Sequence, residues 1–452
     1  MRRRPIPLVI VLAALLVGSA LVSSIARPVN PFFEVAGTNA ESTALYCAGL
    51  TDAKGAAFGH VAFENTSDAR RTLALRVSSD AKTSWTGSIV LAAHTRTLLT
   101  PSTLVKGQNF GVAAEISGTG VVGEVVTTDR RAELPCVDEG QQSWYATGFD
   151  TRVGSSATLN ILNPTATPAV FSVSIYSSAG FSAPAPFQGL SVAPHGEVTV
   201  NLGDQIVNTT NVGVRVKVLR GALAVTGVED SNGTTSLVAG SPAPTPTSWF
   251  SSVTTVNGAT AQVRLANPHN TTTSVTVKVS LAHFAVTPQT VQLAPFSTGI
   301  VTITPNPAIA PDAYATLKVS ASQGVVADLA VGDGSYQQLS APPTPVRTFT
   351  VEDFNGRGFD ATRVTNISDQ PATLSVAWVR LATTSGGPIS GATVKTTLAP
   401  GATISLSSLF TAAPAWNVGK IVVSTRRPVL VAGLTLPTRP AGSLVVAPLN
   451  GR

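Results

Sequence analysis

The chain has 452 residues, of which 12% are charged and 43% hydrophobic, and its formal net charge is +6. This length predicts about three to four domains. Disordered chains have few apolar residues and a high net charge, and this chain has neither. The composition therefore excludes a disordered protein. Four of the six positive charges come from Arg2, Arg3, Arg4 and Arg27, and the remaining 425 residues carry only +2. The basic balance therefore does not indicate nucleic-acid binding.

The N-terminus has the pattern of an export signal. Arg2 to Arg4 precede an uncharged segment whose most apolar part is 8–17, and such a basic flank stays in the cytoplasm. Residues 8–26 are long enough to cross a hydrocarbon core of ~30 Å as one helix. Alternatively, the small residues around Ala20 or Ala26 would let signal peptidase release the chain. Both outcomes place the rest of the protein outside the cytoplasm, as a single-pass membrane protein or a secreted one.

Cys47 and Cys136 are the two cysteines of the chain, 89 positions apart. An even number of cysteines in an exported protein predicts a disulfide, here between the first and last strands of one domain. Two unpaired buried thiols are the alternative. The sequence has no CxxC motif and no Cys/His cluster, so it offers no zinc or redox site.

Four internal repeats of about a hundred residues determine the predicted architecture. An Asn ends an alternating strand in each repeat, at Asn65, Asn163, Asn267 and Asn366, with separations of 98, 104 and 99. A second alternating strand follows each Asn, and an apolar hairpin lies near the end of each repeat. The last three repeats also carry an Ala-Pro turn, for which the first repeat has Ala93 in place of Pro.

Val, Thr and Ser dominate after the N-terminal segment, Gly and Pro recur between them, and no long stretch has a helical period. About seven short strands per hundred residues are typical of a sandwich. We therefore predict an all-β chain of four tandem β-sandwich repeats with immunoglobulin-like architecture, following an N-terminal transmembrane or signal helix. The predicted segments are the signal at 1–27 and the repeats at 42–138 (with the disulfide), 143–240, 248–340 and 347–450.

Two further features lie at the repeat boundaries. Pro-rich segments at 240–246 and 341–345 are predicted to be extended linkers, because Pro cannot join a central strand. An aromatic opens each of the last three repeats, in Trp144-Tyr145, in Trp249-Phe250 and at Phe349. We interpret these residues as part of core strands rather than as ligand-stacking aromatics.

The sequence contains no recognisable catalytic constellation. Five histidines are scattered without metal-ligand spacing, and a GxSxG elbow is missing. Two corresponding late segments could hold calcium, Glu229-Asp230-Ser231-Asn232-Gly233 and Asp328 with Asp333-Gly334, but neither follows the spaced DxDxDG loop. We interpret them as tight hairpin turns. We predict no catalytic, cofactor-binding or metal-ligating residues, no cofactor and no enzymatic activity. The histidines are His60, His94, His195, His269 and His283.

The basic RRRP start, the single apolar segment and the markers Asn163-Pro164, Asn267-Pro268 and Leu398-Ala399-Pro400-Gly401 occur with a strong preference for Arg over Lys, 22 to 8. In this combination the chain resembles an uncharacterised family of actinobacterial secreted or membrane-anchored proteins of unknown function with tandem immunoglobulin-like β-repeats. The resemblance implies an envelope location and supplies no catalytic residues.

Taken together, these features favour a non-enzymatic cell-envelope protein, an extracytoplasmic stalk or scaffold that binds an envelope protein or a cell-wall glycan. An array of carbohydrate-binding modules is the alternative, and a cell-wall hydrolase is a third hypothesis. We expect no nucleic-acid partner, and contact with the membrane only through the N-terminal segment.

Overall fold

The computed structural model describes most of the chain from residue 42 onward. The described residues are 42–51, 59–127, 133–231, 234–253, 260–280, 286–303, 315–332, 337–340, 346–353, 363–380, 389–409, 419–432 and 444–448. The predicted signal at 1–27, the Pro-rich segment at 341–345 and His283 lie outside these ranges. Within them, no helix is long and apolar enough to cross a membrane.

The prediction of an all-β protein is confirmed. Alternation of apolar and polar residues makes the strands: β3 (Arg71–Ser79) buries Leu73, Leu75 and Val77, while Thr72 and Ala74 on its other side are exposed. Short 3-10 turns are the helical segments of the described chain. They are η1 (Pro101–Thr103), η2 (Ala185–Phe187), η3 (Leu202–Asp204) and η6 (Ser407–Leu409).

The strands form four consecutive groups, which we call units 1 to 4. Each unit has a first sheet, which contains its opening strand, and a second sheet, which contains the strand that leads into the recurring Asn. Unit 1 (42–138) has a first sheet of β1 (Ala44–Thr51), β6 (Asn109–Ile116), β3 and β4 (Ser84–Leu91), and a second of β5 (Thr95–Leu99), β2 (Gly59–Asn65), β7 (Val121–Thr127) and β8 (Glu133–Pro135).

Unit 2 (141–240) repeats this plan. Its first sheet consists of β12 (Gly180–Ser182), β11 (Ala169–Ser177), β15 (Val212–Arg220) and β9 (Ser143–Phe149), with β13 (Leu190–Val192) paired to β11. Its second sheet consists of β14 (Glu197–Asn201), β10 (Ser155–Leu162), β16 (Ala224–Ser231) and β17 (Thr234–Val238).

In units 3 (245–340) and 4 (346–448), one long strand runs through both sheets. In unit 3 it is β23 (Ala315–Gly332), which pairs with β18 (Thr245–Val253), β20 (Thr273–Ser280), β19 (Thr260–Ala266) and β24 (Gln337–Ser340); β21 (Gln289–Leu293) and β22 (Thr298–Ile303) complete the unit. In unit 4 it is β30 (Gly419–Ala432), joined by β25 (Val346–Asp353), β26 (Arg363–Asn366), β27 (Ala372–Arg380), β28 (Ile389–Leu398), β29 (Thr403–Ser405) and β31 (Leu444–Pro448).

The core of each unit lies between its two sheets. In unit 1, Leu73 and Val112 of the first sheet meet Phe63 of the second, all fully buried. Val228 and Leu237 of unit 2 belong to this same apolar cluster. The second sheet of unit 2 therefore contributes to the apolar cluster of unit 1, while unit 2 has a separate core between its own two sheets.

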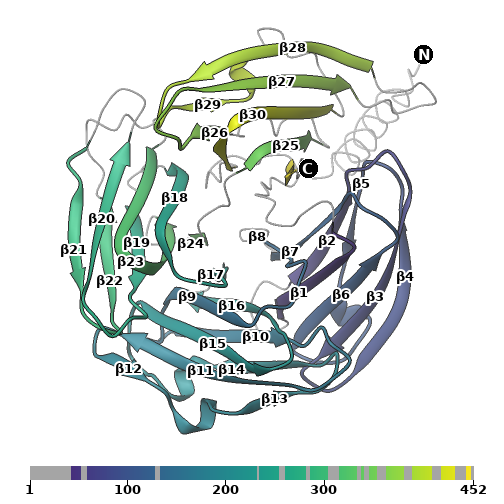
Figure 1. Ribbon diagram of the computed structural model, residues 1–452. Coiled ribbons are helices and arrows are strands. Elements are labelled where there is room, and N and C mark those ends of the chain that lie inside the picture. Colours follow the sequence, from purple (N-terminus) through teal and green to yellow (C-terminus); the bar gives the residue numbers. More distant parts are fainter. Residues whose placement is uncertain are drawn as a thin grey trace, which may run out of the picture.

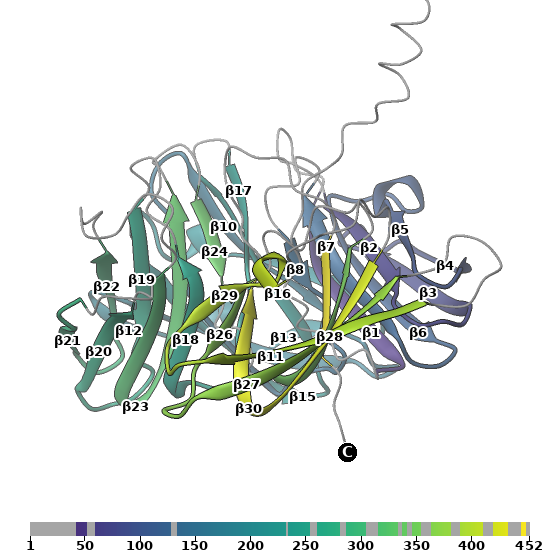
Figure 2. The ribbon, with the colours of Figure 1, turned by 90° about the horizontal axis from the view of Figure 1, so that it is seen from above.

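Successive units follow one another along an arc that brings unit 4 round toward unit 1 (Figure 1). Seen from above, the four units lie in a single tier (Figure 2). The opening strand of each of the first three units lies against the second sheet of the unit that follows: β1 contacts β10 and β16, β9 contacts β19 and β23, and β18 contacts β26 and β30. The sheets of neighbouring units therefore pack directly against each other, whereas extended linkers would hold the units apart.

The Pro-rich segment at 240–246 departs from the prediction of an extended linker. Ser241 exchanges two backbone hydrogen bonds of 2.8 Å with Tyr145. Thr245 and Thr247 already belong to β18, and the register shifts between them, at Pro246. Because β18 pairs with β23 alone, it is an edge strand, where a Pro is tolerated at such an irregularity.

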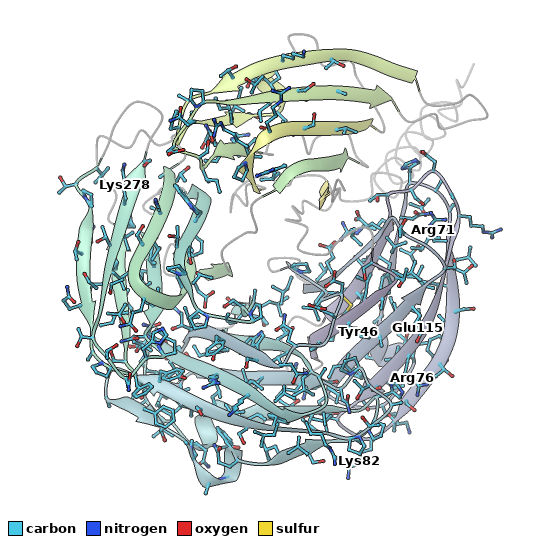
Figure 3. The ribbon with its side chains drawn as sticks, viewed as in Figure 1. Tyr46, Arg71, Arg76, Lys82, Glu115 and Lys278 are labelled. Carbon is cyan, nitrogen blue, oxygen red and sulfur yellow. A yellow bond between two sulfur atoms is a disulfide. The ribbon has the colours of Figure 1, made fainter. Side chains whose placement is uncertain are left out.

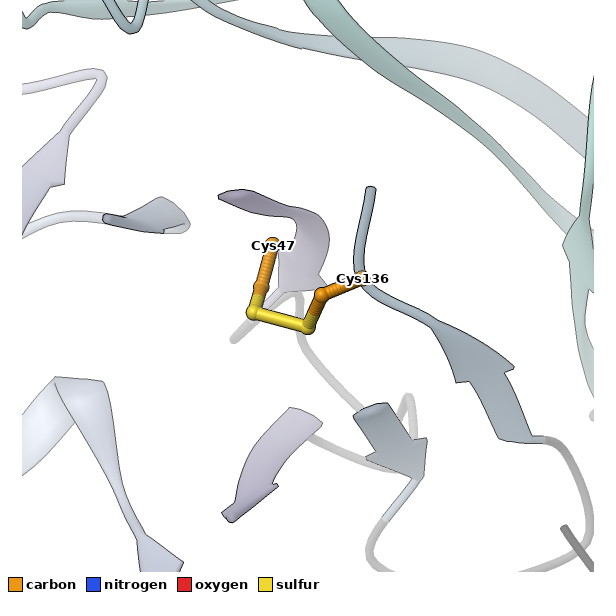
Figure 4. Close-up of a disulfide and its surroundings, with 2 residues drawn as sticks. All are labelled: Cys47 and Cys136. Atoms are coloured by element: carbon orange, nitrogen blue, oxygen red, sulfur yellow. A yellow bond between two sulfur atoms is a disulfide. The ribbon is translucent and has the colours of Figure 1, made fainter. Parts of the chain in front are cut away.

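The predicted disulfide is confirmed. Cys47 lies on β1 and Cys136 follows β8, so the bond ties the first sheet of unit 1 to the end of its second sheet (Figure 4). The two Cα atoms are 4.5 Å apart, and both side chains are buried. Beside the bond, Tyr46 and Val137 exchange backbone hydrogen bonds of 2.7 and 3.0 Å.

Replacing both cysteines with Ala should lower the free energy of unfolding of unit 1 by about 4 kcal/mol, because the disulfide closes a long loop in the unfolded chain. Urea unfolding of the oxidised wild type, the reduced wild type and the Cys47→Ala/Cys136→Ala variant measures the difference. The reduced protein should match the variant. A loss below about 1 kcal/mol would contradict this role of the disulfide.

Candidate functional site

The four recurring Asn side chains are fully buried and make nearly the same hydrogen bonds. Asn163 Nδ2 donates to the carbonyl oxygens of Thr167 at 2.8 Å and Ala193 at 3.0 Å. Its Oδ1 accepts from the backbone N–H of Thr165 at 2.9 Å and from the Thr165 hydroxyl at 2.8 Å. We call this arrangement the Asn clamp. In the other units the Nδ2 donors reach Ala69 and Ala92, Thr271 and Ala294, and Gln370 and Leu398.

Each clamp borders a turn that contains one residue with positive φ. These residues are His94 (φ 51), His195 (φ 52), Phe296 (φ 53) and Gly401 (φ 74). In units 2 to 4 they follow the Ala-Pro pair, and Pro before a residue with positive φ is typical of a type II turn. The two strongest sequence markers, the Asn and the Ala-Pro turn, therefore belong to one local structure.

The turn of each later unit lies against the preceding unit. The carbonyl of His195 accepts a hydrogen bond of 2.5 Å from the Ser78 hydroxyl at the end of β3. The ring of Phe296 stacks on Tyr176 at the end of β11, with centroids 6.4 Å apart and an interplanar angle of 10°. A Cβ added at Gly401 would lie 4.0 Å from Ser280 Cβ at the end of β20. In these three junctions, equivalent strand ends therefore receive equivalent turns.

Small residues allow the sheets to approach one another at these junctions. A Cβ added at Gly111 would lie 2.8 Å from Leu162 of the next unit. At the corresponding place, one added at Gly213 would lie 2.9 Å from Ala266. Leu162 and Ala266 each directly precede the Asn of a clamp. Any larger side chain at these glycines would therefore push two units apart.

The aromatic residues that open the units divide between two roles. Trp144 and Phe250 are buried in the cores of units 2 and 3, as predicted. Tyr145 instead packs on Ala266 and Val326 of unit 3. Tyr46 of unit 1, labelled in Figure 3, likewise lies against Leu162 and Ala224 of unit 2. The side chain of Phe349 lies outside the described residues.

The junction between units 2 and 3 contains a buried polar network. Arg264 of β19 donates through Nη1 to the Gly148 carbonyl of unit 2. Its cross-strand neighbour Asp328 accepts a hydrogen bond of 2.8 Å from the Thr147 backbone N–H of unit 2. Asn211 of unit 2 donates to the Gly299 carbonyl of unit 3 at 2.8 Å. Directed bonds therefore add to apolar packing in fixing how unit 3 sits on unit 2.

Burial dominates the electrostatics of this junction. Loss of solvation raises the pKa of Asp328 to about 8, although the Thr147 N–H and the Arg264 charge oppose the shift. Burial likewise raises the pKa of Glu229 of β16 to about 8, against the opposing charge of Arg264. Both carboxyl groups therefore retain protons at a pH where exposed carboxyl groups are ionised.

The junction between units 1 and 2 holds a second buried acid. Glu197 of β14 is 5% exposed, and neither of its carboxyl oxygens has a hydrogen-bond partner among the described residues. Burial raises its pKa well above the ordinary value, and the negative charge of Asp80 in unit 1 raises it further. Two successive junctions thus each contain a carboxyl group that favours the protonated form.

Sequence reasoning did not single out Arg264, Glu197 or the ion pairs of unit 1. In unit 1, Arg96 of β5 lies 3.1 Å from Glu64 and 2.6 Å from Glu124, both of which are buried. The available signal was a charged residue inside an alternating strand, at a position directed away from the unit's own core. For Arg264 and Glu197, that signal becomes informative only when a neighbouring unit covers the second face of the sheet.

The Asn232-Gly233 and Asp333-Gly334 parts of the predicted late turns lie outside the described residues, but the prediction is wrong for Glu229 and Asp328. Both lie within paired strands, Glu229 opposite Ala157 and Asp328 opposite Arg264. Strand pairing and continuous burial extend through both residues, so their strands reach further toward the end of each unit than the acidic residues suggested. Asp230, which follows Glu229, also lies in β16, where its Oδ1 accepts a hydrogen bond from the Thr235 hydroxyl.

The described histidines stay apart from one another. His60 Nδ1 is 2.9 Å from the Thr100 hydroxyl, His94 Nε2 is 2.8 Å from Asp68 Oδ1, and His269 Nε2 is 2.7 Å from the Gly324 carbonyl. Within the described ranges, no group of three or more His, Cys, Asp or Glu side chains is placed to hold a metal ion.

Comparison with known proteins gives one family. Residues 131–408 match the profile of a family of unknown function, DUF5719. The matched segment begins near the end of unit 1 and ends in unit 4, and it includes the polar network between units 2 and 3. No curated protein and no solved structure matches the chain.

Replacing Asn163 with Ala should lower the free energy of unfolding by about 2–4 kcal/mol, because the Thr165 N–H and the Ala193 carbonyl lose their buried partner. Asn270 is exposed and provides the matched control, with a change expected within about 0.5 kcal/mol. Urea unfolding of both variants measures the difference. Equal stability of the two variants would contradict the clamp.

The stability of the protein should fall as the pH rises from about 4 toward about 8. In this range the unfolded chain releases the Asp328 proton that the folded chain retains, so the unfolded state binds fewer protons. Asp328→Asn keeps an acceptor for the Thr147 N–H and should weaken this dependence. Unfolding at pH 5, 7 and 8.5 tests it against exposed Asp204→Asn as the control; equal slopes in the two variants would be the contrary result.

Proposed function

We propose that this chain, which belongs to the DUF5719 family of unknown function, is a non-enzymatic scaffold of the cell envelope. In this proposal four immunoglobulin-like β-sandwich repeats form one rigid arc outside the cytoplasm. The arc presents its outer surfaces to an envelope protein or a cell-wall polymer. The family match supplies no activity, so the proposal rests on the sequence and on the junctions.

The repetition of one kind of junction is the observation that supports this proposal most. Each later unit places its clamp-bordered turn on the end of an equivalent strand, at Ser78, Tyr176 or Ser280. Modules joined by flexible linkers would not need such contacts, because their relative orientation would be free. Fixed orientation is what a scaffold requires, and the curvature favours a scaffold over an extended stalk.

The proposed location depends on the N-terminal export signal. The basic start and the apolar segment at 8–26 favour a single-pass anchor with an extracytoplasmic C-terminal region, and signal cleavage with secretion is the alternative. The disulfide between Cys47 and Cys136 supports an oxidising compartment in either case.

An array of carbohydrate-binding modules remains the second candidate. One observation favours it: Trp249 of unit 3 is partly exposed and lies beside a lysine on the outer face of its sheet. Partly exposed aromatic rings on sheet faces provide flat surfaces for ligands with one apolar side.

Gly111→Val tests whether rigidity matters for function. The added side chain should press on Leu162, separate units 1 and 2 and increase the radius of gyration of the full-length chain in small-angle scattering. It should also reduce co-sedimentation with actinobacterial cell-wall material, because the proposal makes the fixed arc the binding surface.

Ala74→Val is the matched control, because Ala74 is exposed on the same sheet and a β-branched residue suits a strand. This variant should keep both the scattering curve and the co-sedimentation of the wild type. Wild-type chain that fails to bind either cell-wall material or any envelope protein in cross-linking experiments would overturn the proposal.

A further inference from the structure

The face of the first sheet of unit 3 that is turned away from its own core carries an aromatic residue and two lysines in one row, and the same face contacts unit 4 through Thr316 and Thr403. Trp249 of β18 lies opposite Lys318 of β23, and Lys318 lies opposite Lys278 of β20. The Lys318 ammonium is 5.1 Å from the centroid of the Trp249 ring. Lys278 is exposed, and the other two side chains are partly exposed. We call these three residues the basic row.

Two like charges in directly opposite positions of neighbouring strands repel each other and destabilise a sheet. Asp328 is the only acidic residue among the described residues of unit 3, and it is buried at the junction with unit 2. Two lysines in directly opposite positions, with no carboxylate beside them among the described residues of unit 3, are suited to binding an anionic ligand.

The wider charge distribution favours the same kind of ligand. From residue 245 to the C-terminus the sequence has 13 Lys and Arg against 7 Asp and Glu, whereas 28–244 have 13 against 17. The near-neutral sum outside the N-terminal segment therefore conceals an acidic first half and a basic second half. An anionic partner would be attracted to the half that contains the basic row.

The surroundings of the row are rich in hydroxyl groups. Thr276, Ser320 and Thr290 lie on the same face of the sheet, and the hydroxyls of Thr276 and Thr290 are 3.1 Å apart. Lys278, labelled in Figure 3, is two residues from Ser280, where the turn of unit 4 approaches. The row thus lies beside a junction whose orientation is fixed.

We propose that the basic row binds a carboxylated polysaccharide, which deepens the proposed function by naming the class of wall partner and rests on it. The ammonium groups of Lys278 and Lys318 bind carboxylates, and the neighbouring hydroxyls hydrogen-bond to the sugar hydroxyls. Trp249 is a positioning residue: its ring holds the Lys318 ammonium through a cation–π interaction. Two lysines without an arginine fork suit point-charge recognition better than bidentate binding of phosphate.

Titration calorimetry of the full-length chain with oligogalacturonate as the probe tests this site. The wild type should bind, and the affinity should fall as salt rises from about 50 to about 200 mM, because charge attraction drives the contact. Lys278→Gln/Lys318→Gln should weaken binding by about tenfold or more. Neutral dextran should not bind.

Lys395→Gln is the matched control, since Lys395 is an exposed lysine on the corresponding sheet of unit 4 and lies opposite Ser375. Its affinity should stay within about twofold of the wild type. Trp249→Leu should weaken binding although it keeps apolar packing, and Trp249→Tyr should retain most of it, because only Tyr keeps a ring for the Lys318 ammonium. Thermal unfolding of each variant verifies that it folds.

Three results would overturn the site: no binding of oligogalacturonate, equal weakening by Lys395→Gln, or equally tight binding of poly-glutamate, which would indicate an acidic protein. Wall binding that is unchanged in Gly111→Val despite a larger radius of gyration, with oligogalacturonate binding in the wild type, would count against the scaffold alone. Wall co-sedimentation that persists in Lys278→Gln/Lys318→Gln, without oligogalacturonate binding in the wild type, would count against the basic row alone.

Discussion

The buried Asn amide in each unit stabilises a local turn and, through that turn, the packing of one unit on another. The Asn side chain satisfies carbonyl groups at the end of one strand and in a turn that lies about thirty residues away in the chain, as Asn163 does for Thr167 and Ala193. Without it these part-buried carbonyl groups would lose their partner in the protein, which costs stability. The clamp also borders the turn that rests on the preceding unit, so the geometry of the arc depends on it.

The junctions combine apolar packing with buried carboxyl groups, whose ionised form would be more stable in water. Glu197 and Asp328 lie at successive junctions, and both belong to paired strands of a sheet. A carboxyl group that stays protonated can be buried without a counter-charge, whereas its ionised form requires one. Arg264 supplies such a charge between units 2 and 3, and it reaches a carbonyl of unit 2 as well. The relative position of two units is thereby coupled to the protonation of a few side chains.

The sequence was sufficient for the all-β class and the disulfide, because alternation, turn residues and cysteine number reflect local chemistry. Asn163 and Pro194 were recognisable as markers, but their shared role was not, since a hydrogen bond across thirty residues leaves no local pattern. Arg264 and Asp328 were missed or misplaced for a related reason. Both faces of their sheet are buried, and the pattern of one strand cannot reveal that a neighbouring unit supplies the second cover. The Pro-rich segment at 240–246 was mistaken for a spacer because Pro246 occupies an edge strand.

Contacts between units are head-to-tail. The earlier unit contributes a strand end and its first sheet, and the later unit contributes a turn and its second sheet. Such an interface does not close on itself, and each repetition adds the same rotation. With four units the rotation already returns the chain toward its beginning (Figure 1). A protein of this design could not be lengthened indefinitely in one plane, because a further unit would have to occupy space near unit 1 or rise out of the tier. Curvature, set by residues as small as Gly111 and Gly213, therefore limits how many such units one flat arc can contain.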